Sequence, residues 1–152
     1  AALELHKKYS NISFNFITGI GYDYEKHGVK TDEAKNIYIY PNVPVVSKYT
    51  KKADIAVTSQ GRTIYELASM GLPSIVLSQN LREATHDFAT MQNGFLNLGI
   101  GEVVDTETIA NTLSWLIETP NIRKNMHELM LKCDLKTGIG RCKKIILGEY
   151  ND

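Results

Sequence analysis

The sequence is poor in the features that mark several protein classes. Its two cysteines, Cys133 and Cys142, are too few for a disulfide framework and lack the paired Cys/His spacing of a zinc site. Seventeen Lys and Arg residues balance seventeen Asp and Glu residues, so no basic field indicates nucleic acid or an anionic membrane as a partner. No apolar run approaches the ~20 residues of a membrane-spanning helix. We therefore expect a cytoplasmic protein with free thiols.

Two further absences concern ligands. The chain has no dense cluster of Asp and Glu, so no metal is indicated. It also has no GxGxxG motif, and its one strand–glycine–helix turn reads SQG (Ser59–Gly61). No cofactor is expected.

Short apolar segments alternate with helical patterns along the 152 residues, of which 43% are hydrophobic. This alternation predicts a single α/β domain over 1–152, a Rossmann-like parallel sheet flanked by helices. Strands are predicted at 12–18, 37–40, 54–58 and 73–77, and helices at 1–9, 45–52, 62–70, 83–92, 106–118, 122–133 and 141–147. The segment between 19 and 36 is expected to be loop with at most a short helix. We expect Asp105 and Thr119 to begin helices, and Gly71 and Gly148 to end them.

The segment TSQGRTIYELASMGLP, residues 58–73, places a helix directly after a strand. In open α/β sheets, ligands bind beyond the carboxyl ends of the strands, and the first amides of a helix favour an anion. Gly61 lets a ligand approach the backbone, and Ser59 and Thr63 are natural phosphate donors. Arg62 is either a surface residue or a phosphate clamp. The turn is thus a candidate diphosphate site.

Glu66 raises a question, because a carboxylate next to phosphates repels them unless it has another role. On a helix it lies on the same side as Thr63, ~5 Å further along the axis, which suits a ribose attached to a diphosphate. Its carboxylate can accept hydrogen bonds from both hydroxyls of the ribose. The spacing alone favours a solvated helix residue, paired with Arg62 at an offset of four.

A second polar segment, SQNLREATHDFA (residues 78–89), follows the next predicted strand. If the two strands are neighbours, its start faces the same crevice. Gln79, Asn80, Thr85 and His86 carry groups suited to sugar hydroxyls. An ordinary capped loop is the alternative, and for His86 alone a structural or surface role. His6, His27 and His127 have no evident partners in the sequence and are expected at the surface.

At these residues the sequence resembles a known family. ADIAVTSQGRTIYELASMGLPSIVLSQN (residues 53–80) is similar to the C-terminal half of nucleotide-sugar enzymes with the GT-B fold. These include the peptidoglycan UDP-N-acetylglucosamine transferase and, closer still, the UDP-sugar hydrolases of pseudaminic acid synthesis with their spore-coat polysaccharide relatives. DLKTGIGRCKKIIL (residues 134–147) resembles their Asp-Gly-x-Gly-x-x-Arg segment more loosely, because Thr137 departs from the glycine pattern. The resemblance covers roughly 37–147.

The resemblance implies a role for each part of the site. Glu66 would bind the ribose, and Ser59, Gly61, Arg62 and Thr63 the diphosphate. Asn42 and Val43 would meet the uracil, and the loop with Gln79, Asn80, Thr85 and His86 the donor sugar. The function implied is binding of UDP or a UDP-sugar in cell-surface polysaccharide or nonulosonic acid biosynthesis.

The family's catalytic base lies in an N-terminal domain to which nothing here corresponds. We therefore expect one half of a GT-B fold, truncated at its N-terminus, that binds a nucleotide sugar without turnover. Its parent would be a glycosyltransferase or a nucleotide-sugar hydrolase, and neither the sugar nor the oligomeric state follows from the residues. A UDP-N-acetylglucosamine 2-epimerase-like domain shares this fold, but the loop 81–88 lacks the expected second acid. A non-catalytic flavodoxin-like regulatory domain is a third reading, for which the acidic cluster at the strand ends is absent.

Overall fold

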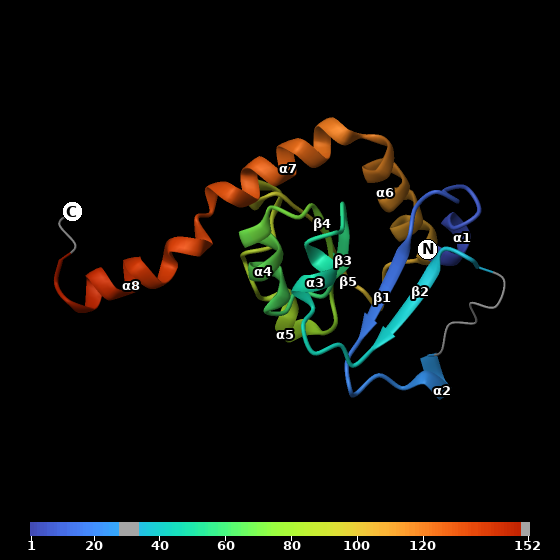
Figure 1. Ribbon diagram of the computed structural model, residues 1–152, viewed down its shortest axis with the longest axis horizontal. Coiled ribbons are helices and arrows are strands. Elements are labelled where there is room, and N and C mark those ends of the chain that lie inside the picture. The colour runs from blue at the N-terminus through green and yellow to red at the C-terminus, as the bar shows by residue number, and fades with distance from the viewer. Residues whose placement is uncertain (28–33, 150–152) are drawn as a thin grey trace. The chain divides into compact units, whose positions relative to one another are not determined.

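The computed structural model describes residues 1–27 and 34–149, in two compact units (Figure 1). Unit 1 comprises Ala1–Lys52 and Asp105–Trp115, and unit 2 comprises Ala53–Val104 and the chain from Leu116 onward. Each unit contains parallel strands accompanied by helices, which confirms the predicted α/β, Rossmann-like class. The description of the chain as a single domain stays a prediction.

Unit 1 is built on two parallel strands, β1 (Phe14–Thr18) and β2 (Ile37–Pro41), with Phe14 opposite Ile37. Its helices are α1 (Ala2–Leu5), α2 (Tyr24–His27), α3 (Ser47–Thr50) and most of α6 (Thr106–Glu118). The predicted helix over 1–9 is thus shortened to four residues, and the one over 45–52 likewise.

The side chain of Asn36 holds the chain between α1 and β1. Its Nδ2 donates to the carbonyl oxygens of His6, Tyr9 and Ile12 at 3.1, 3.0 and 2.8 Å. These three carbonyls lie in the segment after α1, so one side-chain amide ties this segment together, in addition to the 3.0 Å bond from the N–H of Ile12 to the carbonyl of Tyr9.

Unit 2 contains a three-stranded parallel sheet in the order β3-β4-β5. The strands are β3 (Ala56–Thr58), β4 (Ser74–Ser78) and β5 (Phe95–Ile100). Ala56 pairs with Ser74, and Ser74 in turn with Phe95, so the three strands run in register from the same end. β4 is central and almost wholly buried, as its apolar sequence predicts.

The core of unit 2 lies where α4 (Thr63–Met70) and α7 (Pro120–Lys132) pack on this sheet. Ile64 and Val76 are 0% exposed, and Phe95 and Met130 are 1% exposed. Burial of each large side chain contributes about 1.5–3 kcal/mol. Phe88 packs edge-on against Phe95, with ring centroids 5.8 Å apart. The apolar face predicted for α4 is therefore the face that meets the sheet.

The end of α4 is fixed by a glycine in a left-handed conformation. Gly71 has φ of 66°, and the N–H of Leu72 donates to the carbonyl of Leu67 at 3.0 Å, as in a Schellman motif. The carbonyl oxygen of Gly71 accepts a 2.7 Å hydrogen bond from Nδ1 of His127 on α7. His127 is exposed as predicted, yet its ring also joins the middle of α7 to the end of α4.

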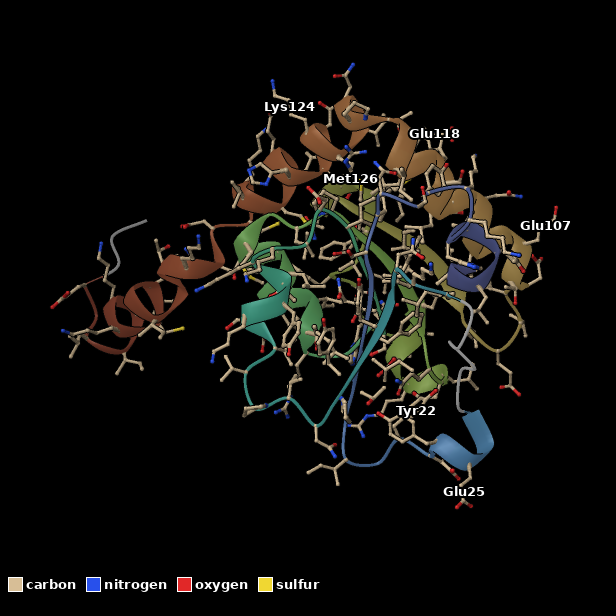
Figure 2. All side chains as sticks on the ribbon, turned by 45° about the vertical axis from the view of Figure 1, so that its right-hand side comes forward. Tyr22, Glu25, Glu107, Glu118, Lys124 and Met126 are labelled. Atoms are coloured by element: carbon tan, nitrogen blue, oxygen red, sulfur yellow. The ribbon has the colours of Figure 1, made fainter. Side chains whose placement is uncertain are left out.

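The last helices follow the predicted pattern closely. Asp105 begins α6, where its Oδ1 accepts from the N–H of Thr108 at 2.6 Å, and Thr119 takes the same position before α7. In Figure 2, Lys124 projects from the outer side of α7 and Met126 from its inner side, in agreement with the 5% exposure of Met126. α8 (Gly138–Ile146) leads away from the sheet of unit 2 (Figure 1).

Two predictions for unit 2 were wrong. The helix expected over 83–92 is replaced by α5 (Leu81–Ala84), an irregular segment, and the 3-10 helix η1 (Met91–Asn93). β5 was not predicted at all, although FLNL has the alternation of a strand. Phe88 explains the first error, because its contacts with Tyr65 and Phe95 draw the chain out of a helical path.

The remaining predicted strands and helices are present, and apart from the shortened helix over 1–9 their ends differ by up to three residues. In the part of the chain that the structure describes, no helix is long and apolar enough to cross a membrane. Cys133 and Cys142 are free thiols.

Candidate functional site

The candidate site lies at the carboxyl ends of β3 and β4 in unit 2. The two strands are parallel neighbours, with Thr58 opposite Val76, so the segments that follow them leave the sheet at the same edge. One is the turn Ser59–Arg62, which leads into α4, and the other is the loop that contains α5. The predicted adjacency of the diphosphate turn and the donor-sugar loop is therefore present.

The start of α4 offers three free donors. Among the residues that the structure describes, the N–H groups of Gly61, Arg62 and Thr63 have no hydrogen-bond acceptor. Arg62 precedes the helix without a capping side chain, and the positive end of the helix dipole lies at the same place. An anion bound here would satisfy donors that the fold leaves open.

Neither backbone conformation nor space requires a glycine at position 61. Its φ lies outside the left-handed region, and an added Cβ would contact Ser59 Oγ at 3.4 Å and Glu83 Oε1 at 3.5 Å. Both are ordinary contacts, so the fold tolerates a side chain there. What glycine provides is open room between Ser59 and Glu83, directly beside the free amides.

Glu66 lies one turn into α4, on the side away from the core. Its neighbours Ile64 and Leu67 are buried, whereas Glu66 itself is exposed. Within the described segments its carboxylate has no hydrogen-bond or ion-pair partner, and its backbone oxygen accepts from Ser69 Oγ at 2.7 Å. As far as the described residues are concerned, neither Arg62 nor another side chain occupies the carboxylate, which leaves it open to a ligand.

The loop after β4 is held by two side-chain oxygens that accept from main-chain N–H groups around the start of α5. Asn80 Oδ1 accepts from the N–H of Glu83 at 2.9 Å, and Glu83 Oε2 accepts from the N–H of Gln79 at 2.8 Å. Thr85 Oγ1 donates to the carbonyl of Arg82 at 2.8 Å. These bonds fix the backbone while the side chains of Gln79 and Asn80 stay exposed.

A buried side chain that sequence reasoning missed ties these segments together. Gln60 is 2% exposed, and its Oε1 accepts from Ser78 Oγ at 2.8 Å and Asn97 Nδ2 at 2.9 Å. Its Nε2 donates to the carbonyl of His86, and Nδ1 of His86 donates to the carbonyl of Gln60 at 2.9 Å. His86 therefore has the structural role that the sequence left open, whatever else it contacts.

Asn42 and Val43, the residues predicted to meet the base, lie in unit 1 directly after β2. Asn42 has φ of 51°, and its N–H donates to the carbonyl of Thr18 at 2.8 Å. The structure thus gathers the predicted diphosphate, ribose and donor-sugar residues within unit 2. The roles of all these residues stay predictions.

Two curated proteins are similar to parts of this chain. Spore coat polysaccharide biosynthesis protein SpsG of Bacillus subtilis is 34% identical over 79 residues, which are 51% of this chain and 23% of SpsG. Uncharacterized protein MJ1062 of Methanocaldococcus jannaschii is 32% identical over 94 residues, which are 56% of this chain and 19% of that protein. The chain thus matches less than a quarter of the length of either relative. No protein-family model matches it, and no solved structure does.

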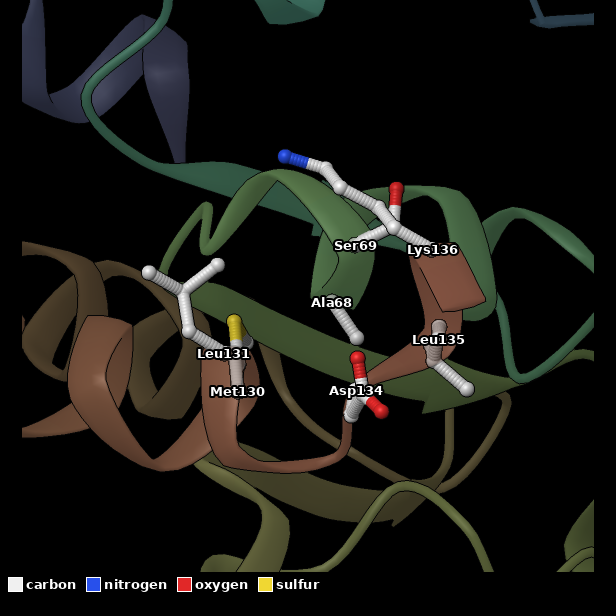
Figure 3. Close-up of a pocket in the computed structure, with 7 residues that line it drawn as sticks. All are labelled: Ala68, Ser69, Met130, Leu131, Asp134, Leu135 and Lys136. Atoms are coloured by element: carbon white, nitrogen blue, oxygen red, sulfur yellow. The ribbon is translucent and has the colours of Figure 1, made fainter. Parts of the chain in front are cut away.

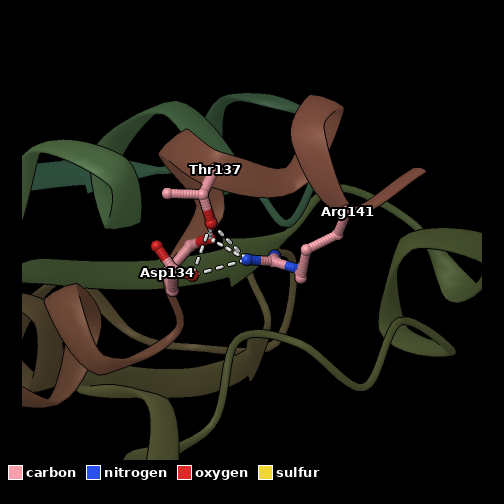
Figure 4. A network of polar contacts seen from close by, with 3 residues as sticks. All are labelled: Asp134, Thr137 and Arg141. Carbon is pink, nitrogen blue, oxygen red and sulfur yellow. Dashed lines mark hydrogen bonds and ion pairs between the residues drawn. The ribbon is translucent and has the colours of Figure 1, made fainter. Parts of the chain in front are cut away.

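The C-terminal segment predicted to resemble Asp-Gly-x-Gly-x-x-Arg forms a compact polar network (Figure 4). Nη1 of Arg141 donates to the carbonyl of Asp134 at 2.9 Å and to Oδ2 of Asp134 and Oγ1 of Thr137, both at 2.5 Å. Asp134 has φ of 47°, which brings its carbonyl and carboxylate to the same guanidinium. The network fixes the path between α7 and α8 and lies outside the predicted site.

A small hollow beside this network is unsuited to a nucleotide (Figure 3). It lies between α4, the end of α7 and the 3-10 helix η2 (Leu135–Thr137), and is lined by Ser69, Met130, Asp134 and Lys136 among others. Its volume is about 50 Å³, whereas small-molecule sites usually span ~300–1,000 Å³.

In the described parts of the chain, no three His, Cys, Asp or Glu side chains are grouped so that they could hold a metal ion. The pKa of Asp105 is lowered, because its carboxylate accepts from the backbone and then from the hydroxyl of Thr108. Asp105 begins α6 and is not part of the candidate site.

Proposed function

We propose that this chain is the UDP-sugar-binding part of a nucleotide-sugar enzyme of polysaccharide biosynthesis. The observation that carries the proposal is the start of α4, where three amides at the edge of the sheet are followed, one turn later, by the carboxylate of Glu66, all four groups without a partner among the described residues. The similarity to SpsG, a spore coat polysaccharide biosynthesis protein, supports the biosynthetic context.

Each group of the site has a part in this proposal. The diphosphate binds Ser59, Gly61, Arg62 and Thr63, where the amides and the helix dipole stabilise its charge. Glu66 accepts hydrogen bonds from the ribose hydroxyls, a role in which a carboxylate is favoured because diols are donors.

The donor sugar and the base complete the ligand. The exposed side chains of Gln79, Asn80 and Thr85, with the remaining ring nitrogen of His86, meet the sugar hydroxyls. Asn42 and Val43 meet the uracil.

The catalytic residues are expected on a different domain from the one that binds the nucleotide sugar. We infer a parent enzyme of the GT-B type, either a glycosyltransferase or a UDP-sugar hydrolase, in which an N-terminal domain supplies the catalytic base. Turnover in a cleft needs groups positioned from both sides. This chain alone then binds a nucleotide sugar in the cytoplasm without consuming it.

Calorimetric titration with UDP tests the proposal. The wild-type chain should bind UDP, and Glu66→Ala should lose about 1–3 kcal/mol of binding free energy, because a charged hydrogen-bond acceptor is removed. Glu128→Ala is the matched control, since Glu128 is another exposed helical glutamate whose contact with Lys124 is a loose surface ion pair. If the folded chain does not bind UDP at millimolar concentration, the proposed function is wrong. Equal losses in both variants would refute the ribose assignment alone.

A further inference from the structure

The side-chain amide of Gln60 connects its own turn to three other parts of unit 2. Its oxygen uses both lone pairs, one for Ser78 at the end of β4 and one for Asn97 on β5. Its nitrogen donates to His86 in the segment after α5, while Gln60 itself belongs to the turn before α4. A buried polar group satisfied in this way has one orientation, because each alternative leaves a donor or acceptor unpaired.

His86 and Gln60 are joined by two hydrogen bonds that run in opposite directions. The side chain of Gln60 donates to the main chain of His86, and the imidazole of His86 donates to the main chain of Gln60. The two residues therefore form a closed ring, and neither moves alone. The segment that contains His86 is fixed to the turn, although 26 residues separate the two positions.

Because the peptide group is planar, the hydrogen bonds between Gln60 and His86 also affect the N–H group that a ligand would meet. The carbonyl of Gln60 and the N–H of Gly61 belong to the same rigid peptide plane. The hydrogen bond from His86 to this carbonyl thus sets the direction of the Gly61 N–H, one of the three free donors of the turn. An anion on that N–H would polarise the same peptide and strengthen the bond from His86.

We propose that Gln60 and His86 are positioning residues, which orient the Gly61 N–H toward a nucleoside diphosphate and report its binding to the donor-sugar loop. The inference rests on the proposed function. In this proposal the diphosphate turn and the donor-sugar loop are coupled, so that a diphosphate bound at the turn changes the hydrogen bonding of the His86 ring.

Titration of UDP into the chain labelled with ¹⁵N-histidine tests this coupling by NMR. UDP should shift the ring resonances of His86 and leave those of His127 unchanged. His127 is the internal control, because its Nδ1 also donates to a main-chain carbonyl, that of Gly71 at the opposite end of α4. Gln60→Leu should weaken UDP binding about three- to tenfold, the effect of one or two net hydrogen bonds, and should abolish the shift of His86.

Two further variants keep the test decisive if Gln60→Leu does not fold. Ser78→Ala removes one donor to the Gln60 oxygen and should reduce both the affinity and the shift. His86→Phe should weaken UDP binding to a similar degree as Gln60→Leu. If UDP binds without moving the His86 resonances, or if these variants bind UDP as the wild type does, the coupling is refuted while the proposed function stands. If the folded wild type does not bind UDP, both are refuted.

Discussion

Substitution of Gly71 by alanine should destabilise unit 2 through two separate effects. The residue has φ of 66°, which costs about 1–2 kcal/mol for a residue with a Cβ. The new Cβ would also lie 2.4 Å from Nδ1 of His127, which must then leave the carbonyl of Gly71. Loss of that hydrogen bond adds about 0.5–1.5 kcal/mol, for a total of about 1.5–3.5 kcal/mol.

Guanidinium unfolding, followed by circular dichroism, measures this loss against a matched glycine. Gly140 lies within α8, and a Cβ there would meet nothing within 4 Å. Gly140→Ala should therefore leave stability unchanged or raise it by up to ~1 kcal/mol, the helix preference of alanine over glycine. The double variant Gly71→Ala/His127→Ala separates the two effects, because it removes the steric conflict and keeps the backbone strain. If Gly71→Ala is as stable as Gly140→Ala, this account of the end of α4 is refuted.

Two other substitutions test charge at the candidate site and at α6. Glu83→Gln removes a carboxylate next to Gly61 while keeping an acceptor for the N–H of Gln79. UDP affinity should therefore rise about two- to fivefold at low salt, in line with repulsion of about 1 kcal/mol between charges ~4 Å apart in water. Unchanged or weaker UDP binding in the calorimeter would contradict this arrangement. Asp105→Ala should lower the unfolding free energy at pH 7, because the Thr108 bonds that lower the Asp105 pKa also stabilise the charged form. That stabilisation is present above the ordinary aspartate pKa of ~3.9 and is lost as the pH falls through the lower pKa of the folded state. The stabilities of wild type and variant should therefore converge as the pH falls below the ordinary value, and a difference that does not shrink would contradict the assignment.

The parts of the fold that follow local rules could be predicted from the sequence. The helix of residues 63–70 combines an apolar face at helical spacing with a glycine at its end, and both signals are local. The parallel pairing of β3 and β4 follows from two short apolar strands with one helix between them.

Tertiary contacts decided what could not be predicted. The residues 83–92 are individually compatible with a helix, but Phe88 contributes more when its ring packs against Tyr65 and Phe95. β5 was missed because it carries Gly99, with φ of 87°, and an irregular register with β4. A glycine within a short strand weakens the pattern by which strands are recognised.

The candidate site also contains residues that local spacing could place and one residue, Gln60, that it could not. Ser59, Gly61, Thr63 and Glu66 lie within eight residues of one another, so their spacing on a turn and a helix could be worked out. Gln60 could not be singled out, because its partners lie 18, 26 and 37 residues away and its polar side chain is typical of a surface turn. Its burial depends on three segments meeting, which no local pattern encodes.

A crystal structure of this chain with UDP tests the central claim most directly. The account predicts the diphosphate within ~2.7–3.2 Å of the amides of Gly61, Arg62 and Thr63, and a ribose hydroxyl at ~2.5–3.0 Å from the Glu66 carboxylate. UDP bound elsewhere, or bound at the turn with its ribose away from Glu66, would contradict it.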